Sequence, residues 1–297
     1  MLADLASILR VHIIAIAMTA ALAFGWALTG RYAWLVAVIG GLDWLCINLL
    51  NRVTDLKEDA ANQIRGTERL AGKGHIVLAV WGGLLGGSFA LSHAFTPELS
   101  WWRVGVQVIG VAYSYRLVPT LAGRRRLKDL YFFKNFMSAM LFVATVFVYP
   151  LAVAHWQFAA PAGWASWVAL VLFFVPFEIT YEILYDMRDL EGDRLAGVPT
   201  YPVRHGMEVS RKIVDALLAI ASATLAAAFV VGAIGARELL MLAAPAIQLG
   251  FYRPRYRRGL TRSDCITITW IGAGLLALWL IGTRLWIDAG LPANIYF

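Results

Sequence analysis

The chain has 297 residues, of which 60% are hydrophobic and 15% are charged, and its net charge is +7. Soluble globular domains contain about 25% charged residues, so this composition, with a mean hydropathy of +0.66, excludes an ordinary soluble domain. The basic residues lie mostly in loops between apolar runs, which indicates membrane topology and argues against a nucleic-acid partner. We therefore expect an all-α integral membrane protein.

The apolar runs predict nine membrane-spanning helices in a single domain over residues 1–297. Each run approaches the roughly 20 residues that a helix needs to cross a bilayer. In chain order the runs cover about 8–29, 32–50, 76–96, 100–116, 130–150, 161–185, 209–233, 236–252 and 265–287. Run 100–116 contains Arg103 and run 236–252 is short, so the expected range is seven to nine. We interpret the first run as a membrane helix and not as a cleaved signal peptide.

Lysine and arginine are divided unequally between the two sides that nine spans create. With their flanking residues, the loops at 51–75, 117–129, 186–208 and 253–264 hold twenty of the 26 basic residues. The opposite side holds Arg31, Arg103, Arg237 and Arg284. Because basic residues concentrate in cytoplasmic loops, we expect these four loops to face the cytoplasm. The runs Arg124–Arg126 and Arg253–Arg258 are typical of such topology signals or of contacts with anionic lipid.

Two acidic clusters close apolar runs on this same predicted side. In the first, NRVTDLKED, residues Asn51, Asp55 and Asp59 are four apart and would share one face of a helix. The second, YDMRDLEGD, contains Asp186, Asp189, Glu191 and Asp193. Carboxylates beside hydrocarbon are energetically unfavourable, so in a membrane protein they indicate a functional site.

Two converging carboxylate clusters would repel each other unless a cation lay between them. Aspartate oxygens suit Mg²⁺, which also binds phosphate oxygens. The same loops carry basic side chains that suit a diphosphate, namely Arg65, Arg69 and Lys73 after the first cluster and Arg188, Arg194 and Arg204 around the second. Carboxylates, metal and basic side chains together would stabilise a departing diphosphate.

Both clusters resemble motifs of the UbiA superfamily of intramembrane prenyltransferases. NRVTDLKED matches its NxxxDxxxD motif, and DLEGDRLAGVPTYPVRHG, residues 189–206, is similar to its second motif. The pairs Tyr113-Ser114, Leu127-Lys128 and Lys134-Asn135 also look like the family's region around the fourth and fifth helices. The resemblance covers nearly the whole chain. It implies nine helices around a central cavity, with cap loops and an active site on the cytoplasmic side.

The resemblance implies an enzyme that ionises an isoprenoid diphosphate with Mg²⁺ and transfers the prenyl group to an acceptor. The implied catalytic residues and metal ligands are Asp55, Asp59, Asp189 and Asp193, with Asn51 as a further ligand. Together with the charge pattern, it gives as candidate substrate-binding residues Asn51, Arg65, Arg69, Lys73, Lys128, Lys134, Glu178, Asp186, Arg194 and Arg204. The expected partners are the diphosphate, membrane lipid and a lipophilic or aromatic acceptor such as a quinone precursor.

Two other functions remain open. A terpene cyclase of the same superfamily would need no acceptor, and a membrane transporter or lipid carrier could use the carboxylates for ion coupling. A transporter would typically place carboxylates at mid-membrane on broken helices, whereas here the densest acid lies at helix ends. The sequence also departs from many relatives, which continue with Asn-x-Pro-x-Arg-Pro-Leu. Here QIRGTERLAGKG follows Asn62, so either Arg65 or Arg69 could replace that arginine and the acceptor stays undecided.

Some of these residues also have a purely structural interpretation. Asp55 and Asp59 could cap helices and pair with Lys57 and Arg52. Lys134 could extend to the membrane interface instead of binding a diphosphate.

A stripe of carboxylates leads from the second cluster into the membrane. Its members step by three or four residues along the sixth run and are Glu178, Glu182, Asp186, Asp189 and Asp193. Asp43 is similarly deep in the second run. Such carboxylates face a cavity or pair with another helix. The stripe therefore predicts acceptor binding or deprotonation by Glu178, with an interhelical contact as the alternative.

Overall fold

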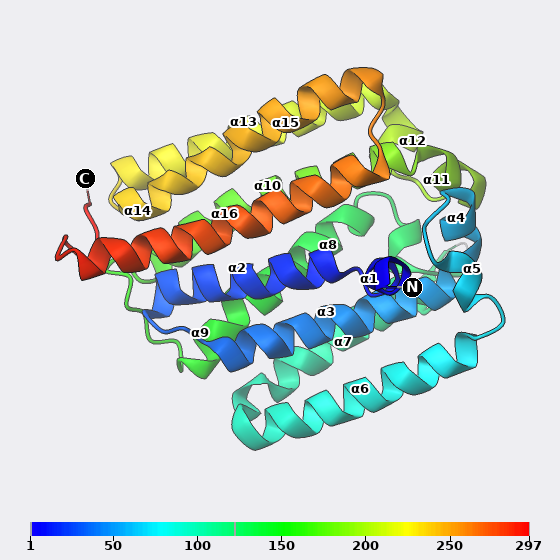
Figure 1. Cartoon of the computed structure of the whole chain (residues 1–297), viewed down its shortest axis with the longest axis horizontal. Coiled ribbons are helices and arrows are strands. Elements are labelled where there is room, and N and C mark those ends of the chain that lie inside the picture. Colours follow the sequence, from blue (N-terminus) through cyan, green and yellow to red (C-terminus); the bar gives the residue numbers. More distant parts are fainter. Residues whose placement is uncertain (1, 122, 297) are drawn as a thin grey trace.

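The computed structural model describes residues 2–121 and 123–296 and is almost entirely helical (Figure 1). Its longer helices are α2 (Val11–Thr29), α3 (Trp34–Thr54), α6 (Gly74–Phe95), α7 (Ser100–Ser114), α10 (Trp164–Arg188), α13 (Met207–Val230), α15 (Ala243–Arg258) and α16 (Arg262–Asp288). Helix α8 (Phe133–Val143), a π-helical turn η3 (Ala144–Val148) and α9 (Tyr149–Val153) form one continuous segment.

Shorter elements connect these helices. They are α1 (Leu2–Ile8), α4 (Leu56–Ala61), α5 (Thr67–Leu70), η1 (Pro97–Leu99), η2 (Leu127–Asp129), α11 (Leu190–Ala196), α12 (Tyr201–His205), α14 (Ala236–Leu239) and η4 (Leu240–Leu242). Strands β1 (Val118–Thr120) and β2 (Gly123–Arg125) pair antiparallel, with Val118 opposite Arg125. The predicted all-α membrane fold is therefore confirmed, apart from this small hairpin in one loop.

Seven helical segments in the described part of the chain are long and apolar enough to cross a membrane. They are Val11–Thr29, Trp34–Thr54, Gly74–Phe95, Phe133–Val153, Trp164–Arg188, Met207–Val230 and Arg262–Asp288. The two remaining predicted spans fall on α7, which has only 15 residues, and on α15, whose last turn carries three arginines. The count of nine is therefore not confirmed, while seven lies within the expected range.

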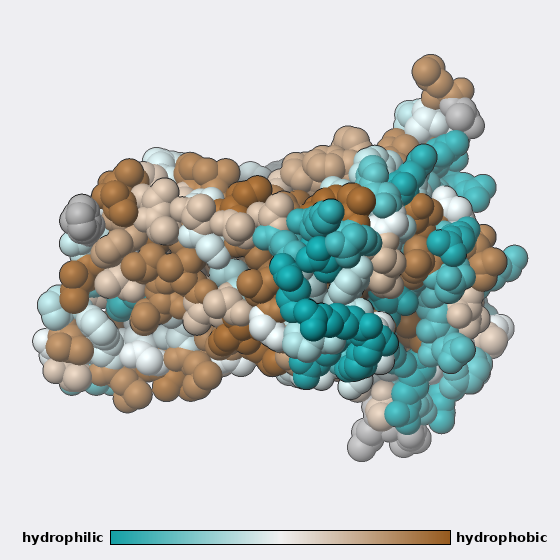
Figure 2. Space-filling view, turned by 90° about the horizontal axis from the view of Figure 1, so that it is seen from above, coloured by the Kyte–Doolittle hydropathy of each residue, from teal (hydrophilic) through white to brown (hydrophobic). Residues whose placement is uncertain are grey.

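The molecule has one polar end. The short helices α4, α5, α11 and α12 gather there, and the C-terminus lies at the opposite end (Figure 1). In the view of Figure 2, hydrophilic residues concentrate over the same end, while much of the remaining surface is hydrophobic. This distribution fits a helical bundle whose sides contact lipid and whose polar end projects from it.

Aromatic side chains hold together the helices that lead to this end. Phe24 of α2 lies 4.6 Å from Phe147 of η3 and 5.6 Å from Phe174 of α10, measured between ring centres. Phe147 and Phe174 are 5.3 Å apart with an edge-to-face geometry, which aromatic rings favour. All three rings are buried. The core therefore fixes α2, α8–α9 and α10 relative to one another.

Asp43 and Arg103 form an ion pair inside the bundle. Both side chains are fully buried, and a guanidinium nitrogen lies 2.7 Å from the carboxylate. Asp43 also accepts hydrogen bonds from Gln107 at 2.9 Å and Tyr149 at 2.9 Å, while Arg103 donates to the carbonyl oxygen of Ser88 at 2.7 Å. For Asp43, the structural alternative is therefore the correct one. The pair also explains how an arginine is accommodated in the fourth predicted span.

Candidate active site

A polar cavity of about 160 Å³ lies at the polar end of the bundle. Its walls come from the long helices α2, α3, α7, α8, α10 and α16 and from the short elements α1, α4, η2 and α11. Many of the predicted site residues line it, namely Asn51, Asp55, Asp59, Lys128, Lys134, Glu178, Asp186, Asp189 and Asp193. The fold therefore brings both acidic clusters to one cavity, although about 130 residues separate them in the chain.

The first cluster lies where α3 passes into α4. The N–H of Asp55 donates to the carbonyl oxygen of Asn51 at 2.9 Å, and the N–H of Asp59 donates to that of Asp55 at 2.7 Å. The four-residue hydrogen-bond pattern thus continues through the junction between the two helices. Because residues four apart share a helix face, all three side chains point to the same side, where they are buried.

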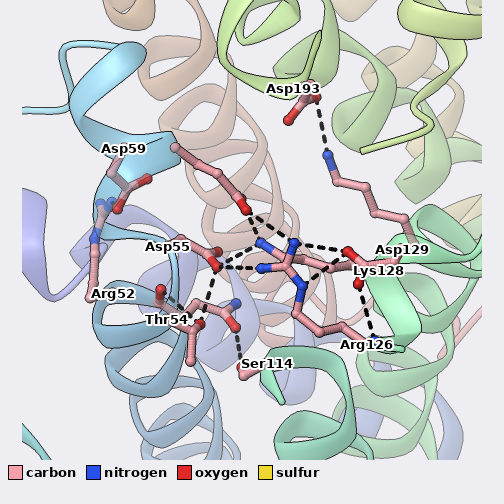
Figure 3. A network of polar contacts seen from close by, with 12 residues as sticks. Arg52, Thr54, Asp55, Asp59, Ser114, Arg126, Lys128, Asp129 and Asp193 are labelled. Carbon is pink, nitrogen blue, oxygen red and sulfur yellow. Dashed lines mark hydrogen bonds and ion pairs between the residues drawn. The ribbon is translucent and has the colours of Figure 1, made fainter. Parts of the chain in front are cut away.

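Basic and polar side chains surround this first cluster (Figure 3). Arg52 lies 2.5 Å from Asp59, and the Lys128 ammonium lies 2.6 Å from Asp55. The Ser114 hydroxyl donates to the side-chain oxygen of Asn51. The Arg52–Asp59 pair matches one part of the structural alternative, but Lys57 is exposed and Asp55 pairs with Lys128 instead. The cluster is therefore more than a helix cap.

Arg126 belongs to the same network, a contact that our interpretation of run 124–126 did not include. Its guanidinium lies 3.1 Å from Glu58 and 2.8 Å from Asp129 (Figure 3). Burial opposes ionisation of Asp129, but hydrogen bonds from the Arg126 side chain and backbone lower its pKa below the usual value. Arg124 and Arg125 remain exposed on β2. The chain after the hairpin thus directs one arginine of the three toward the first acidic cluster.

The second cluster lies where α10 passes into α11. Asp186 accepts hydrogen bonds from Lys134 at 2.6 Å and Asn135 at 3.0 Å, and Asp189 accepts one from Arg188 at 2.7 Å. Lys134 lies 3.4 Å from Asp193. Lys134 thus reaches the cavity and not the lipid interface. Burial raises the pKa of Asp193 to about 6, and Lys134 opposes this effect. A bound cation would favour the charged carboxylate.

A close contact between α4 and α11 joins the two clusters. The N–H of Gly192 donates to the side-chain oxygen of Asn62 at 3.0 Å. A Cβ atom at position 192 would lie 2.3 Å from the Asn62 side chain, far inside van der Waals contact. Glycine is therefore required here for the two helices to approach. Asn62 lies three residues after Asp59, and Gly192 lies directly before Asp193. This contact therefore fixes the distance between the two acidic motifs.

Five predicted substrate-binding residues do not line the cavity in this structure, and their role in substrate binding stays a prediction. Each is exposed, because its side chain pairs or stacks elsewhere or projects outward. Arg65 and Arg69 pair with Asp4 at 2.5 and 2.8 Å, Arg194 with Glu191 at 3.3 Å, Arg204 stacks on Tyr131, and Lys73 precedes α6. The basic residues that do line the cavity, besides Lys128 and Lys134, are Arg10, Arg52, Arg188 and Arg262.

Sequence reasoning missed most of these cavity arginines. Arg188 was already named as a basic side chain suited to a diphosphate, whereas Arg52, one residue after Asn51, was considered only as an ion-pair partner. Arg10 and Arg262 precede or begin α2 and α16. Nothing in the pattern distinguished them from other basic residues at span ends. Tyr181 and Tyr185, which also line the cavity, carried no positional signal either, whereas Tyr113 belongs to a pair that resembles the family.

The deeper carboxylates of the stripe point into the cavity. Glu182 accepts a hydrogen bond from Ser138 at 2.7 Å. Glu178 is buried and lines the cavity, and no described residue donates a hydrogen bond to its side chain. The interhelical alternative therefore applies to Glu182 but not to Glu178. A buried carboxyl without such a partner is free to contact a ligand.

An apolar cavity of about 100 Å³ continues from the polar one. Ile16, Phe142, Glu178 and Tyr181 line both cavities. Its other lining residues are mostly aromatic or aliphatic, including Phe24, Phe173, Phe174, Phe177, Met241, Leu276 and Trp279. The site therefore joins a charged chamber to a hydrocarbon-lined one, with Glu178 at the boundary.

The donors in the charged chamber suit a hard divalent cation. They are aspartate and asparagine oxygens, the type of ligand that Mg²⁺ prefers. Within residues 2–121 and 123–296, no three His, Cys, Asp or Glu side chains are close enough to hold a metal as they stand. Basic side chains neutralise the aspartates instead. A metal would therefore require these carboxylates to exchange their basic partners for the ion.

Comparison with known proteins shows which protein family the chain is similar to. The model of the UbiA prenyltransferase family matches residues 11–265. A digeranylgeranylglyceryl phosphate synthase from Methanothermobacter thermautotrophicus is 36% identical over 76 residues, or 25% of this chain and 27% of that protein. The chain thus matches about a quarter of that relative's length.

Solved structures share the fold at low sequence identity. A UbiA homolog from Archaeoglobus fulgidus bound to GPP and Mg²⁺ is similar with a TM-score of 0.71 and 17% identity, over 94% of this chain and 98% of the other. A structure described as a UbiA homolog from the same organism bound to DMAPP and Mg²⁺ gives a TM-score of 0.69 and 18% identity, over 93% and 97%. These similarities concern the fold alone.

Proposed function

Since the chain belongs to the UbiA prenyltransferase family and is a membrane-embedded prenyltransferase, we propose that it uses Mg²⁺ to transfer a prenyl group from an isoprenoid diphosphate to a lipophilic, anionic acceptor. One observation carries this proposal. Both acidic motifs and six basic side chains line a single polar cavity that continues into an apolar one. A molecule with a diphosphate head and a hydrocarbon tail has the matching division of charge.

The diphosphate head would occupy the charged chamber. Asp55, Asp59, Asp189 and Asp193, with Asn51, would hold the magnesium ions. Bound magnesium would neutralise the diphosphate and assist its departure. Lys128, Arg52, Arg188 and Lys134 each contact one of these aspartates. If the aspartates bound the metal ions, these basic side chains would become available to bind phosphate oxygens.

The prenyl tail would lie in the apolar cavity. Its aromatic walls exclude water, which would otherwise capture the allylic cation, and ring faces stabilise positive charge. The solved A. fulgidus homologs bind GPP or DMAPP with Mg²⁺, which supports a donor of this class. Reaction would break the bond between the prenyl carbon and the diphosphate oxygen. The same carbon would then bond to the acceptor, whose displaced proton would pass to Glu178.

The acceptor would bind beside the arginines that the acidic motifs do not use. Arg10 and Arg262 line the chamber together with Ser7 and His12, and no described carboxylate forms an ion pair with either arginine. Two such cations favour an acceptor with a carboxylate or phosphate group. Digeranylgeranylglyceryl phosphate synthase, which this chain matches over about a quarter of its length, is named after a product that contains a phosphate. An aromatic acceptor remains compatible if it carries an acid group.

Product analysis tests this function. Purified protein is incubated with prenyl diphosphates of increasing length and with three acceptor groups: aromatic carboxylic acids, lipid phosphates and uncharged phenols. Each reaction is run with Mg²⁺ and with EDTA. A magnesium-dependent prenylated acid or phosphate is the expected product. Prenyl hydrocarbon or cyclic product formed without acceptor would instead indicate a terpene cyclase, and an unconsumed donor under every condition would contradict the proposal.

A further inference from the structure

Arg237 is a buried cation at the end of the molecule opposite the charged chamber. Only 9% of the residue is exposed. Its Nε and Nη1 atoms have no hydrogen-bond partner among residues 2–121 and 123–296, and no described carboxylate forms an ion pair with it. Burying a guanidinium is strongly unfavourable unless its donors are satisfied. Among residues 2–121 and 123–296, no side chain satisfies these donors, so the site can accept a ligand.

Backbone contacts and an aromatic ring position Arg237. The backbone N–H of Arg237 donates to the side-chain oxygen of Asn294 at 3.1 Å, and its backbone carbonyl oxygen accepts from the Trp279 indole at 2.7 Å. The guanidinium carbon lies 4.9 Å from the centre of the Trp26 ring. Such a cation–π contact stabilises the charge but leaves the N–H groups unbonded. The side chain is thus held in place without an anion.

The neighbouring carboxylate is already engaged. Glu238 accepts hydrogen bonds from the backbone of Gly235 at 2.8 Å and from the Asn294 amide. It thereby ties α14 to the C-terminal segment, where Ala236 also donates to the carbonyl oxygen of Ile295 at 2.7 Å. Glu238 is therefore a structural group, and the charge of Arg237 remains without an ion pair in the described chain.

Arg237 faces an open cavity of about 770 Å³. Leu170, Ile234 and Ile287 contribute apolar surface, and Tyr32 and Tyr296 line it as well. The cavity lies among the ends of α2, α10, α14 and α16, where tyrosine and tryptophan commonly mark the membrane interface. An apolar wall beside a buried cation at this depth suits the head and upper chain of a phospholipid.

We propose that Arg237 binds the phosphate group of a phospholipid from the leaflet opposite the charged chamber. The unpartnered Nε and Nη1 groups are both cationic N–H donors, and phosphate oxygens accept charge-assisted hydrogen bonds from such groups. Arg284 also lines the cavity but is 64% exposed and pairs with Asp288 at 2.9 Å. It lies at the rim and contributes little. The site is thus separate from catalysis and binds lipid as a structural ligand.

Lipid binding to the full-length protein tests the proposal. Delipidated protein in detergent is titrated with phosphatidylglycerol, with diacylglycerol of the same chains, and with inorganic phosphate, and the unfolding temperature is recorded. The lipid phosphate is expected to raise this temperature and diacylglycerol is not. Arg237→Met should weaken the phosphatidylglycerol response about tenfold or more, whereas Arg284→Met should retain it.

Three results would overturn the proposal. One is an equal response to diacylglycerol, and another is an unchanged response in Arg237→Met. The third is a rise in unfolding temperature with inorganic phosphate as large as that with phosphatidylglycerol, which would show that the anion need not come from a lipid. Native mass spectrometry of the unmodified protein gives a test that does not depend on the variant folding. A one-to-one complex with phosphatidylglycerol that survives where the diacylglycerol complex dissociates is expected, and no such difference would contradict the site.

Discussion

Basic side chains neutralise all four aspartates that we propose as magnesium ligands. The pairs are Asp55 with Lys128, Asp59 with Arg52, Asp189 with Arg188, and Asp193 with Lys134. Converging carboxylates repel one another, and these cations compensate for that repulsion in a partly dehydrated chamber. The same pairing makes the binding of metal and the binding of diphosphate depend on each other. The metal ion must replace the basic side chain beside each aspartate, and the phosphate must replace the aspartate beside each basic side chain.

Glu178 gives a prediction that separates donor binding from transfer. It lies at the boundary of the two cavities and receives no hydrogen bond from the described chain. Glu178→Gln removes the basic oxygen but keeps the side-chain volume. Donor affinity should stay within about twofold, whereas transfer should fall about 10²-fold, the usual contribution of a general base.

The measurement is donor affinity and acceptor turnover on the same purified variant. Glu178→Asp, which keeps the carboxylate one methylene shorter, should recover part of the turnover. Loss of donor binding with unchanged acceptor preference would place Glu178 in the diphosphate site and contradict its proposed role.

For single residues, the sequence predicted which acidic side chains line the cavity better than which basic ones do. Spacing of four residues along a helix sufficed to place Asn51, Asp55 and Asp59 on one face. The direction of a loop side chain has no such periodicity. Arg65, predicted to bind substrate, lies in this structure against Asp4, 61 residues away. Arg126, interpreted as part of a topology signal, also turns inward to pair with Glu58.

The helices themselves depend on a polar network within the membrane. Asp43 connects α3 with α7 through Arg103 and with α9 through Tyr149. Neither Asp43 nor Arg103 lines the charged chamber. Residues that receive several hydrogen bonds in a dry interior specify one arrangement of the surrounding helices. We therefore assign this network to stability and not to chemistry.

Asp43→Asn should destabilise the protein by about 3–5 kcal/mol, because it leaves the buried Arg103 guanidinium without its counterion. Unfolding in detergent measures this loss. Asp288→Asn, which breaks the exposed pair with Arg284, should change stability by less than about 1 kcal/mol. A folded Asp43→Asn protein with normal stability but impaired turnover would show that the network serves catalysis.

Disrupting the α4–α11 contact should alter the geometry of the site and leave the stability of the protein unchanged. A Cβ at Gly192 would lie 2.3 Å from Asn62 and must push the two cap helices apart. Gly192→Ala should therefore lower turnover about 10²-fold, while the long helices keep their unfolding temperature.

Shortening the opposing side chain provides the control. The double variant Gly192→Ala with Asn62→Ala should regain part of the activity, because it removes the clash and loses only one hydrogen bond. Normal turnover in Gly192→Ala alone would show that the spacing of the two motifs is not critical.

Helix positions were largely predictable because long apolar runs have few alternatives in a membrane. The number of spans was less certain. Run 100–116 became a helix of 15 residues, and its Arg103 could be accommodated only through a partner 60 positions away in the chain. The π-helical turn at Ala144–Val148 also left no signal in the hydropathy, since all of its residues are compatible with an α-helix.

For the whole molecule, the concentration of basic residues at the polar end leads us to propose that this end faces the cytoplasm. Leu195 of α11 and Val231 after α13 lie at opposite ends and are 79% and 75% exposed. The two native cysteines are buried. Leu195→Cys should therefore react with an impermeant maleimide only from the cytoplasmic side, and Val231→Cys only from outside. The reverse pattern would invert the orientation, and labelling of both from one side would contradict the fold.

The most direct test of the central claim, that the two acidic motifs bind one diphosphate together through magnesium, is donor affinity. A non-ionising thio analogue of a prenyl diphosphate is titrated into the purified protein and into Asp55→Asn and Asp189→Asn. We predict binding with Mg²⁺, loss of binding in EDTA, and about 10²-fold weaker binding in each variant, whereas the exposed control Glu191→Gln should bind normally. Unchanged affinity in EDTA, or in either motif variant, would contradict the claim.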